Sequence, residues 1–113
     1  MELSTEKIGD VTVVGVLTEV LDAGNTEEFK TGFASILNES NKVVFELGRV
    51  KFIDSSGCGT LLFCQKQLSK LGGDLKLCGV QESVHSLFEL VRMDRILGMF
   101  DTKEDAVDSF KKK

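Results

Sequence analysis

The chain has 113 residues, of which 42% are hydrophobic and 28% charged; this suits one globular domain and excludes a disordered or fibrous protein. Its formal net charge of −4 excludes the basic face that direct nucleic-acid binding requires. It contains no apolar run of about 20 residues, the length of a membrane span, and its start, MELSTEKIGD, is unlike a secretory signal. We therefore expect a single domain over residues 1–113, located in the cytoplasm, that binds neither nucleic acid nor membrane.

The first half of the chain alternates strand and helix patterns. Residues 2–8 are expected to form a short edge strand in a hairpin with Val11–Leu17, whose continuous apolarity is typical of a strand buried on both faces. Asn25-Thr26-Glu27-Glu28 matches a capping box with Asn25 as the N-cap, ahead of apolar residues at helical spacing. Residues 42–47 (KVVFEL) predict the second central strand.

The second half continues the alternation. A helix is expected from Gly57 to Leu71, ended by a left-handed glycine at Gly72-Gly73, and Asp74–Cys78 predicts the third strand. A third helix, a short strand at Ile96–Phe100 and a last helix introduced by the capping pattern Asp101–Glu104 follow. Alternation of this kind gives parallel strands joined by right-handed crossovers. The fold class is therefore α/β, with a mixed sheet of four or five strands and about four helices.

Few residues suggest catalysis. Cys58, Cys64 and Cys78 have no metal-ligand spacing and are interpreted as small buried hydrophobic residues. His85 is the single histidine and is interpreted as a packing or surface residue of the third helix. Neither Ser55 nor Cys58 has a catalytic base near it in the sequence. We therefore predict a protein that is not an enzyme, with no catalytic residues, no cofactor and no metal site.

The most informative segment is FIDSSGCG, residues 52–59, where a hydrophobic strand gives way at once to a helix. Ser55 or Ser56 is expected at the N-cap, where a hydroxyl lies at the positive end of the helix dipole and a phosphate is tolerated. Gly57 and Gly59 are expected to keep the turn bare, so that another protein can approach it. From these residues alone two interpretations remain open, an ordinary helix cap or a phosphate site. The pattern is neither a P-loop nor a nucleophile elbow.

The run from Lys42 to Gly59, and in it VKFIDSSGCGTLL, resembles the core signature of the STAS domain. It is similar in particular to bacterial anti-sigma factor antagonists. Asp22 stands where the family carries an acidic residue before its first helix. The similarity extends over most of the chain through three further segments: Leu71–Leu77, Ser83–Leu90 and Met93–Leu97.

The resemblance implies a function. In the family, the serine after the aspartate is phosphorylated by an anti-sigma factor that is itself a serine kinase, and that serine corresponds to Ser55. The unphosphorylated protein binds the kinase and releases the sigma factor, and a serine phosphatase reverses the modification. The implied partner-binding residues are Asp22, Asp54, Ser55, Ser56 and Gly57. An alternative is a STAS subunit of another assembly, such as a lipid-transport complex or a stress-sensor scaffold. A monomer and a weak dimer both fit the sequence.

Overall fold

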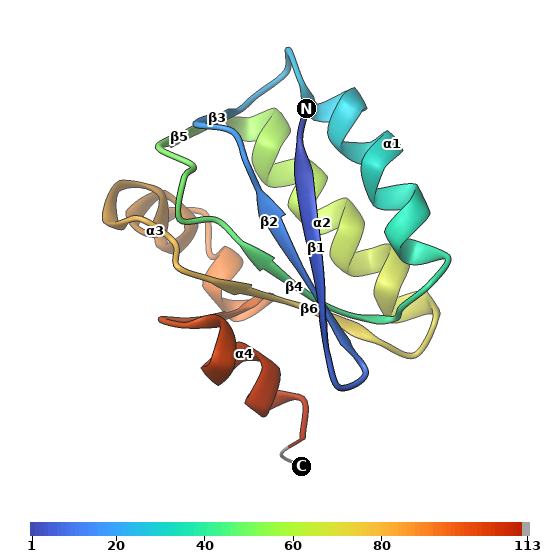
Figure 1. Ribbon diagram of the computed structural model, residues 1–113. Helices are drawn as coiled ribbons and strands as arrows, with labels where there is room; N and C mark the ends of the chain where they lie inside the picture. Colours follow the sequence, from blue (N-terminus) through green and yellow to red (C-terminus); the bar gives the residue numbers. More distant parts are fainter. Residues whose placement is uncertain (112–113) are drawn as a thin grey trace.

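The computed structural model describes residues 1–111 and forms one α/β domain (Figure 1); positions 112 and 113 of the predicted domain lie outside the described residues. The strands are β1 (Leu3–Ile8), β2 (Val11–Val16), β3 (Val20–Leu21), β4 (Lys42–Glu46), β5 (Phe52–Ile53), β6 (Asp74–Cys78) and β7 (Gly98–Phe100). The helices are α1 (Thr26–Leu37), α2 (Ser55–Lys70), α3 (Glu82–Leu90), a short 3₁₀ helix at Met93–Arg95, and α4 (Lys103–Ser109).

The main sheet is mixed and, over the described residues, has five strands in the order β1-β2-β4-β6-β7. β1 is antiparallel to β2, and the remaining neighbours are parallel, as their connection through helices requires. The predicted hairpin, the two central strands and the fold class are therefore confirmed. β3 and β5 pair separately as a parallel two-stranded ribbon, which the sequence analysis did not predict.

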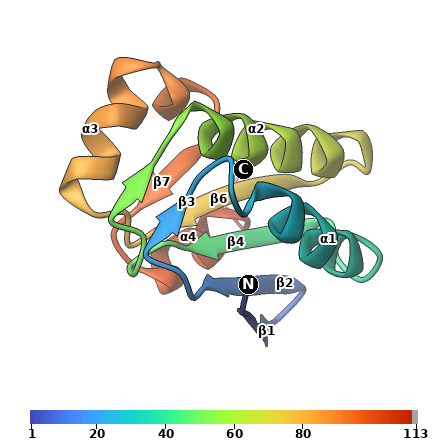
Figure 2. The ribbon, with the colours of Figure 1, turned by 90° about the horizontal axis from the view of Figure 1, so that it is seen from above.

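Helices cover both faces of the sheet. The larger hydrophobic cluster joins one face to α1, α2 and α3, and its centre includes Phe29, Phe45 and Leu61, each fully buried. The smaller cluster packs Ala106 and Val107 of α4 against the opposite face. Figure 2 shows α1 and α2 side by side along the sheet, with α3 beside the β3–β5 ribbon. No helix within residues 1–111 combines the length and the apolarity needed to cross a membrane.

Asn25 occupies the N-cap position of α1, as predicted, but the predicted capping box does not form. Asn25 Oδ1 accepts from the Asp22 amide at 3.0 Å, and Nδ2 donates to the Val20 carbonyl at 2.7 Å. The Asn25 side chain therefore bonds to the loop before α1 and not to the amides of the first helical turn. At α4 the N-cap is Thr102, one residue later than predicted, and its hydroxyl accepts from the Asp105 amide at 3.1 Å.

Candidate functional site

The strand-to-helix turn is organised by Asp54. The backbone of Asp54 is extended (φ −105°, ψ −173°), and its Oδ1 accepts from the Gly57 amide at 2.9 Å, so Asp54 is the N-cap of α2. Ser55 and Ser56 are the first two residues of the helix, and the prediction that one of them is the cap is wrong. Asp54 occupies the position because it is the last extended residue, and a carboxylate is stabilised at the positive helix end.

The second carboxylate oxygen of Asp54 connects this turn to the loop that contains Asp22. Asp54 Oδ2 accepts from the Ala23 amide at 3.2 Å, and the Asp54 amide donates to the Leu21 carbonyl at 3.3 Å. The β3–β5 pairing holds the two segments in register, and Asp22 Oδ1 accepts from the Gly24 amide at 2.9 Å within its own loop. The loop that contains Asp22 therefore lies against Asp54, the residue before Ser55.

The two glycines of the turn have different surroundings. Gly57 is buried, and a Cβ there would lie 2.4 Å from the Leu21 carbonyl oxygen and 2.5 Å from Ile53 Cγ1. Gly57 is therefore not open to a partner, contrary to our expectation; it allows β3 to pack closely on α2. Gly59 is exposed, and a Cβ there would meet no atom within 4 Å. Gly59 is the glycine that leaves the surface bare.

Ser55 is exposed at the start of α2 and borders a shallow hollow. The hollow has a volume of about 300 Å³ and lies between α2 and the end of α3; its lining residues are Ser55, Cys58, Gly59, Leu62, Leu87, Val91 and Met93. Most of these side chains are apolar, so the hydroxyl lies at the edge of a surface that favours contact with another apolar group. Leu62 is half-buried and packs against the main core from this hollow.

The cysteines are packing residues, as predicted. All three are buried and free. Burial raises the pKa of Cys64 to about 12, and burial together with the nearby Asp54 carboxylate raises the pKa of Cys58. Each of these thiols is therefore protonated near neutral pH and a poor nucleophile or metal ligand. Within the part of the chain that the structure describes, no cluster of His, Cys, Asp or Glu side chains is arranged to hold a metal ion.

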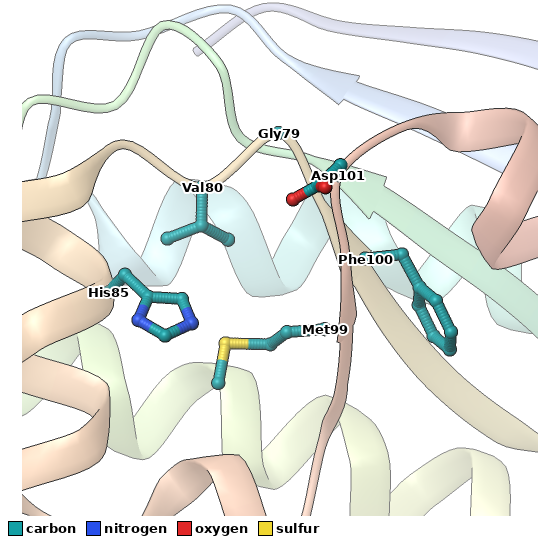
Figure 3. Close-up of a pocket in the computed structure, with 6 residues that line it drawn as sticks. All are labelled: Gly79, Val80, His85, Met99, Phe100 and Asp101. Atoms are coloured by element: carbon teal, nitrogen blue, oxygen red, sulfur yellow. The ribbon is translucent and has the colours of Figure 1, made fainter.

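A second cavity lies away from Ser55, between α3 and the carboxyl ends of β6 and β7. It has a volume of about 210 Å³ and is lined by Gly79, Val80, His85, Met99, Phe100 and Asp101 (Figure 3). His85 is half-buried, and its Nδ1 lies 3.3 Å from Glu89 Oε1 one helical turn away. This cavity shares no lining residue with the hollow beside Ser55, and none of its lining residues is a serine, threonine or cysteine.

The capping role of Asp54 can be tested by stability. Asp54→Ala removes the Gly57 cap and the contact with Ala23 together, so it should lower the free energy of unfolding by about 1–2 kcal/mol. Ser56→Ala is the matched control: the Ser56 hydroxyl caps nothing, so its effect should stay within about 0.5 kcal/mol. Urea denaturation measures both. An equal loss for the two variants would contradict the assignment of the cap.

The structure is a small α/β domain with an exposed serine at the start of a helix, and the comparisons place it in a known family. The chain belongs to the STAS domain family, whose profile matches residues 2–106. BtrV of Bordetella bronchiseptica, assigned as an anti-sigma factor antagonist, is 30% identical over 112 residues, 98% of this chain and 96% of that protein.

Solved structures give the same result. The crystal structure of a Thermotoga maritima protein, also assigned as an anti-sigma factor antagonist, has a TM-score of 0.86 at 27% identity and covers 97% of this chain and 95% of its own. SpoIIAA, an anti-sigma factor antagonist, shares the fold in its unphosphorylated form: TM-score 0.72, 21% identity, 99% of this chain and 100% of that one. These relatives are named for a regulatory role and not for a catalysed reaction, which agrees with the prediction that the chain is not an enzyme.

Proposed function

We propose that this protein is an anti-sigma factor antagonist switched off by phosphorylation of Ser55. In the proposal, the unphosphorylated protein binds an anti-sigma factor with serine kinase activity and releases the sigma factor, and a serine phosphatase restores the active form. The binding surface comprises Asp22, Asp54, Ser55 and Ser56, with Gly57 shaping it from inside. The protein acts in the cytoplasm as a monomer or weak dimer.

The observation that carries the proposal is the placement of an exposed serine on a rigid turn. Ser55 is the first residue of α2, and Asp54 fixes this helix end to the Asp22 loop through hydrogen bonds of 2.9 and 3.2 Å. A kinase therefore meets an accessible hydroxyl whose position is fixed by its neighbours. The first-turn amides of the helix and its dipole tolerate a phosphate there without unfolding.

The same placement explains how phosphate turns binding off. A phosphoserine adds a charge of roughly −1.5 to −2 near neutral pH. At Ser55 this charge would adjoin the Asp54 carboxylate and the Asp22 loop, and a partner docking there must desolvate all of them. Like charges brought together in a desolvated interface cost several kcal/mol. SpoIIAA of Bacillus, which shares this fold, has been solved in both phosphorylated and unphosphorylated forms, and this supports the proposal.

The modification site is tested by incubating the protein with its anti-sigma kinase and ATP. Phosphate-affinity electrophoresis should show one shifted band for the wild type and for Ser56→Ala, and none for Ser55→Ala. Mass spectrometry should locate the phosphate on Ser55. A phosphate on Ser56, or a shifted band for Ser55→Ala, would overturn the assignment.

A further inference from the structure

The hollow beside Ser55 continues along α2. A second hollow of about 480 Å³ is lined by Gly59, Leu62, Phe63, Gln65, Lys66 and Ile96. Gly59 and Leu62 border both hollows, so the two hollows lie side by side on the surface. We call the two hollows together, between α2 and residues 87–96, the α2–α3 groove.

The groove carries much of the exposed apolar surface of the domain. Phe63 borders it, and Val91 and Ile96 are 50% and 54% exposed on its opposite wall. Leu90, adjacent to Val91, is 79% exposed. Full burial of an apolar side chain of this size is favourable by roughly 1.5–3 kcal/mol of free energy. Exposed apolar side chains gathered beside Ser55 therefore indicate a protein contact.

The cations around the groove indicate the chemistry of the contact. Lys66 lines the groove, Arg92 stands between the lining residues Val91 and Met93, and Arg95 precedes Ile96. Within the described residues none of these three cations forms an ion pair with a carboxylate. Segment 91–96 contains one acid, Asp94. Within residues 1–111, one unpaired cation, Lys66, therefore lines the groove, and two further exposed cations, Arg92 and Arg95, are neighbours in sequence of residues that line it.

The backbone of Arg92 gives a second, independent observation. Arg92 has φ 63° and ψ 26°, and among the described residues it is the one non-glycine residue with a positive φ. It follows the C-cap of α3, Val91, at the position where glycine is the usual residue. A side chain with a Cβ is strained in this left-handed conformation. Arg92 is also exposed, so its charged side chain is accessible to a partner.

We propose that the α2–α3 groove docks a segment of the anti-sigma factor in which apolar side chains are flanked by carboxylates. The apolar groups enter the groove, and the carboxylates pair with Lys66, Arg92 and Arg95. The inference rests on the proposed function, because the groove begins at Ser55 and the same partner covers both. Phosphorylation of Ser55 then acts at one end of the interface, and the side chains along the groove determine which partner binds.

The kinetics of binding test the charges. Rim charges act mainly on the association rate and its dependence on salt. Surface plasmon resonance with the anti-sigma kinase should show that Arg95→Glu and Arg92→Gly together lower the association rate at least about tenfold at low salt and flatten its salt dependence. Arg92→Gly alone should melt no lower than the wild type, which separates lost charge from lost folding. Lys7→Glu matches the charge reversal of Arg95→Glu, lies on β1 at the opposite sheet edge, and should bind as the wild type does.

Cross-linking identifies the groups that meet. A carbodiimide joins an amine to a nearby carboxylate without a spacer, so it should link Lys66 to an Asp or Glu of the bound kinase, and Lys66→Arg should remove that link. Three results would overturn the inference: unchanged association rates for the arginine variants, a Lys66 link to a second copy of this chain, or flotation of the protein with phosphatidylglycerol vesicles through these cations. If the phosphorylated protein loses binding while the arginine variants bind normally, the inference fails and the switch stands; if the wild type binds no such kinase, the proposed function fails.

Discussion

Phosphorylation of Ser55 is expected to weaken binding to the anti-sigma kinase by at least about tenfold, which corresponds to roughly 1.4 kcal/mol. The phosphate adds its charge beside the Asp54 carboxylate, which is held in place by the Gly57 and Ala23 amides and cannot move away without losing them. Titration calorimetry of the phosphorylated and unphosphorylated proteins against the kinase measures the difference. Ser55→Asp should show the same direction of change.

The control is Ser55→Ala, which should keep binding and lose phosphorylation, leaving the antagonist permanently active. Thermal melts of all forms should differ little, because a negative charge near a helix N-terminus is tolerated. This separates a charge effect at the surface from unfolding. Unchanged affinity of the phosphorylated protein would remove the switch, whatever Ser55→Asp shows.

Gly57→Ala should lower the free energy of unfolding by about 2–3 kcal/mol, which is large for the addition of one methyl group. The new Cβ would lie 2.4 Å from the Leu21 carbonyl oxygen, and a backbone atom cannot rotate away as a flexible side-chain end can. Either β3 separates from β5 or the first turn of α2 shifts. Both movements displace Asp22 relative to Ser55, so binding to the kinase should weaken as well.

Gly59→Ala is the matched control, since it makes the same change two residues later in the same helix. A Cβ at Gly59 has open space around it, and alanine is the better helix former. We expect Gly59→Ala to raise the free energy of unfolding by about 0.5–1 kcal/mol. Guanidinium denaturation of the two variants decides the point. Equal effects would show that the contact between β3 and α2 is not tight.

The sequence predicted the central sheet well because β2 and β4 each consist of a nearly continuous run of apolar residues. Val11, Val13 and Val14 of β2 are all buried, and a strand covered on both faces needs such a continuous run. The ribbon of β3 and β5 was missed because each has two residues, too few for any periodicity. The capping box of α1 was wrong because the Asn25 side chain bonds instead to the backbone of the preceding loop, at Asp22 and Val20.

The sequence located the segment that forms the site, but it did not show which of its residues are exposed. The Asp-Ser-Ser-Gly turn was visible in the sequence, whereas the division of roles among its members required coordinates: Asp54 caps, Ser55 is exposed and Gly57 is buried. The α2–α3 groove was missed because Leu62 and Val91 fit an apolar helical stripe. Only the packing shows that they remain at the surface. The left-handed backbone of Arg92 has no signal in the sequence.

Release of a sigma factor under the control of Ser55 can be measured directly. The direct measurement is the fluorescence anisotropy of a labelled sigma factor bound to its anti-sigma kinase, followed while this protein is added. Unphosphorylated protein should lower the anisotropy to that of free sigma factor, and protein phosphorylated on Ser55 should leave it unchanged at the same concentration. Equal release by the two forms, or no release by either, would contradict the account.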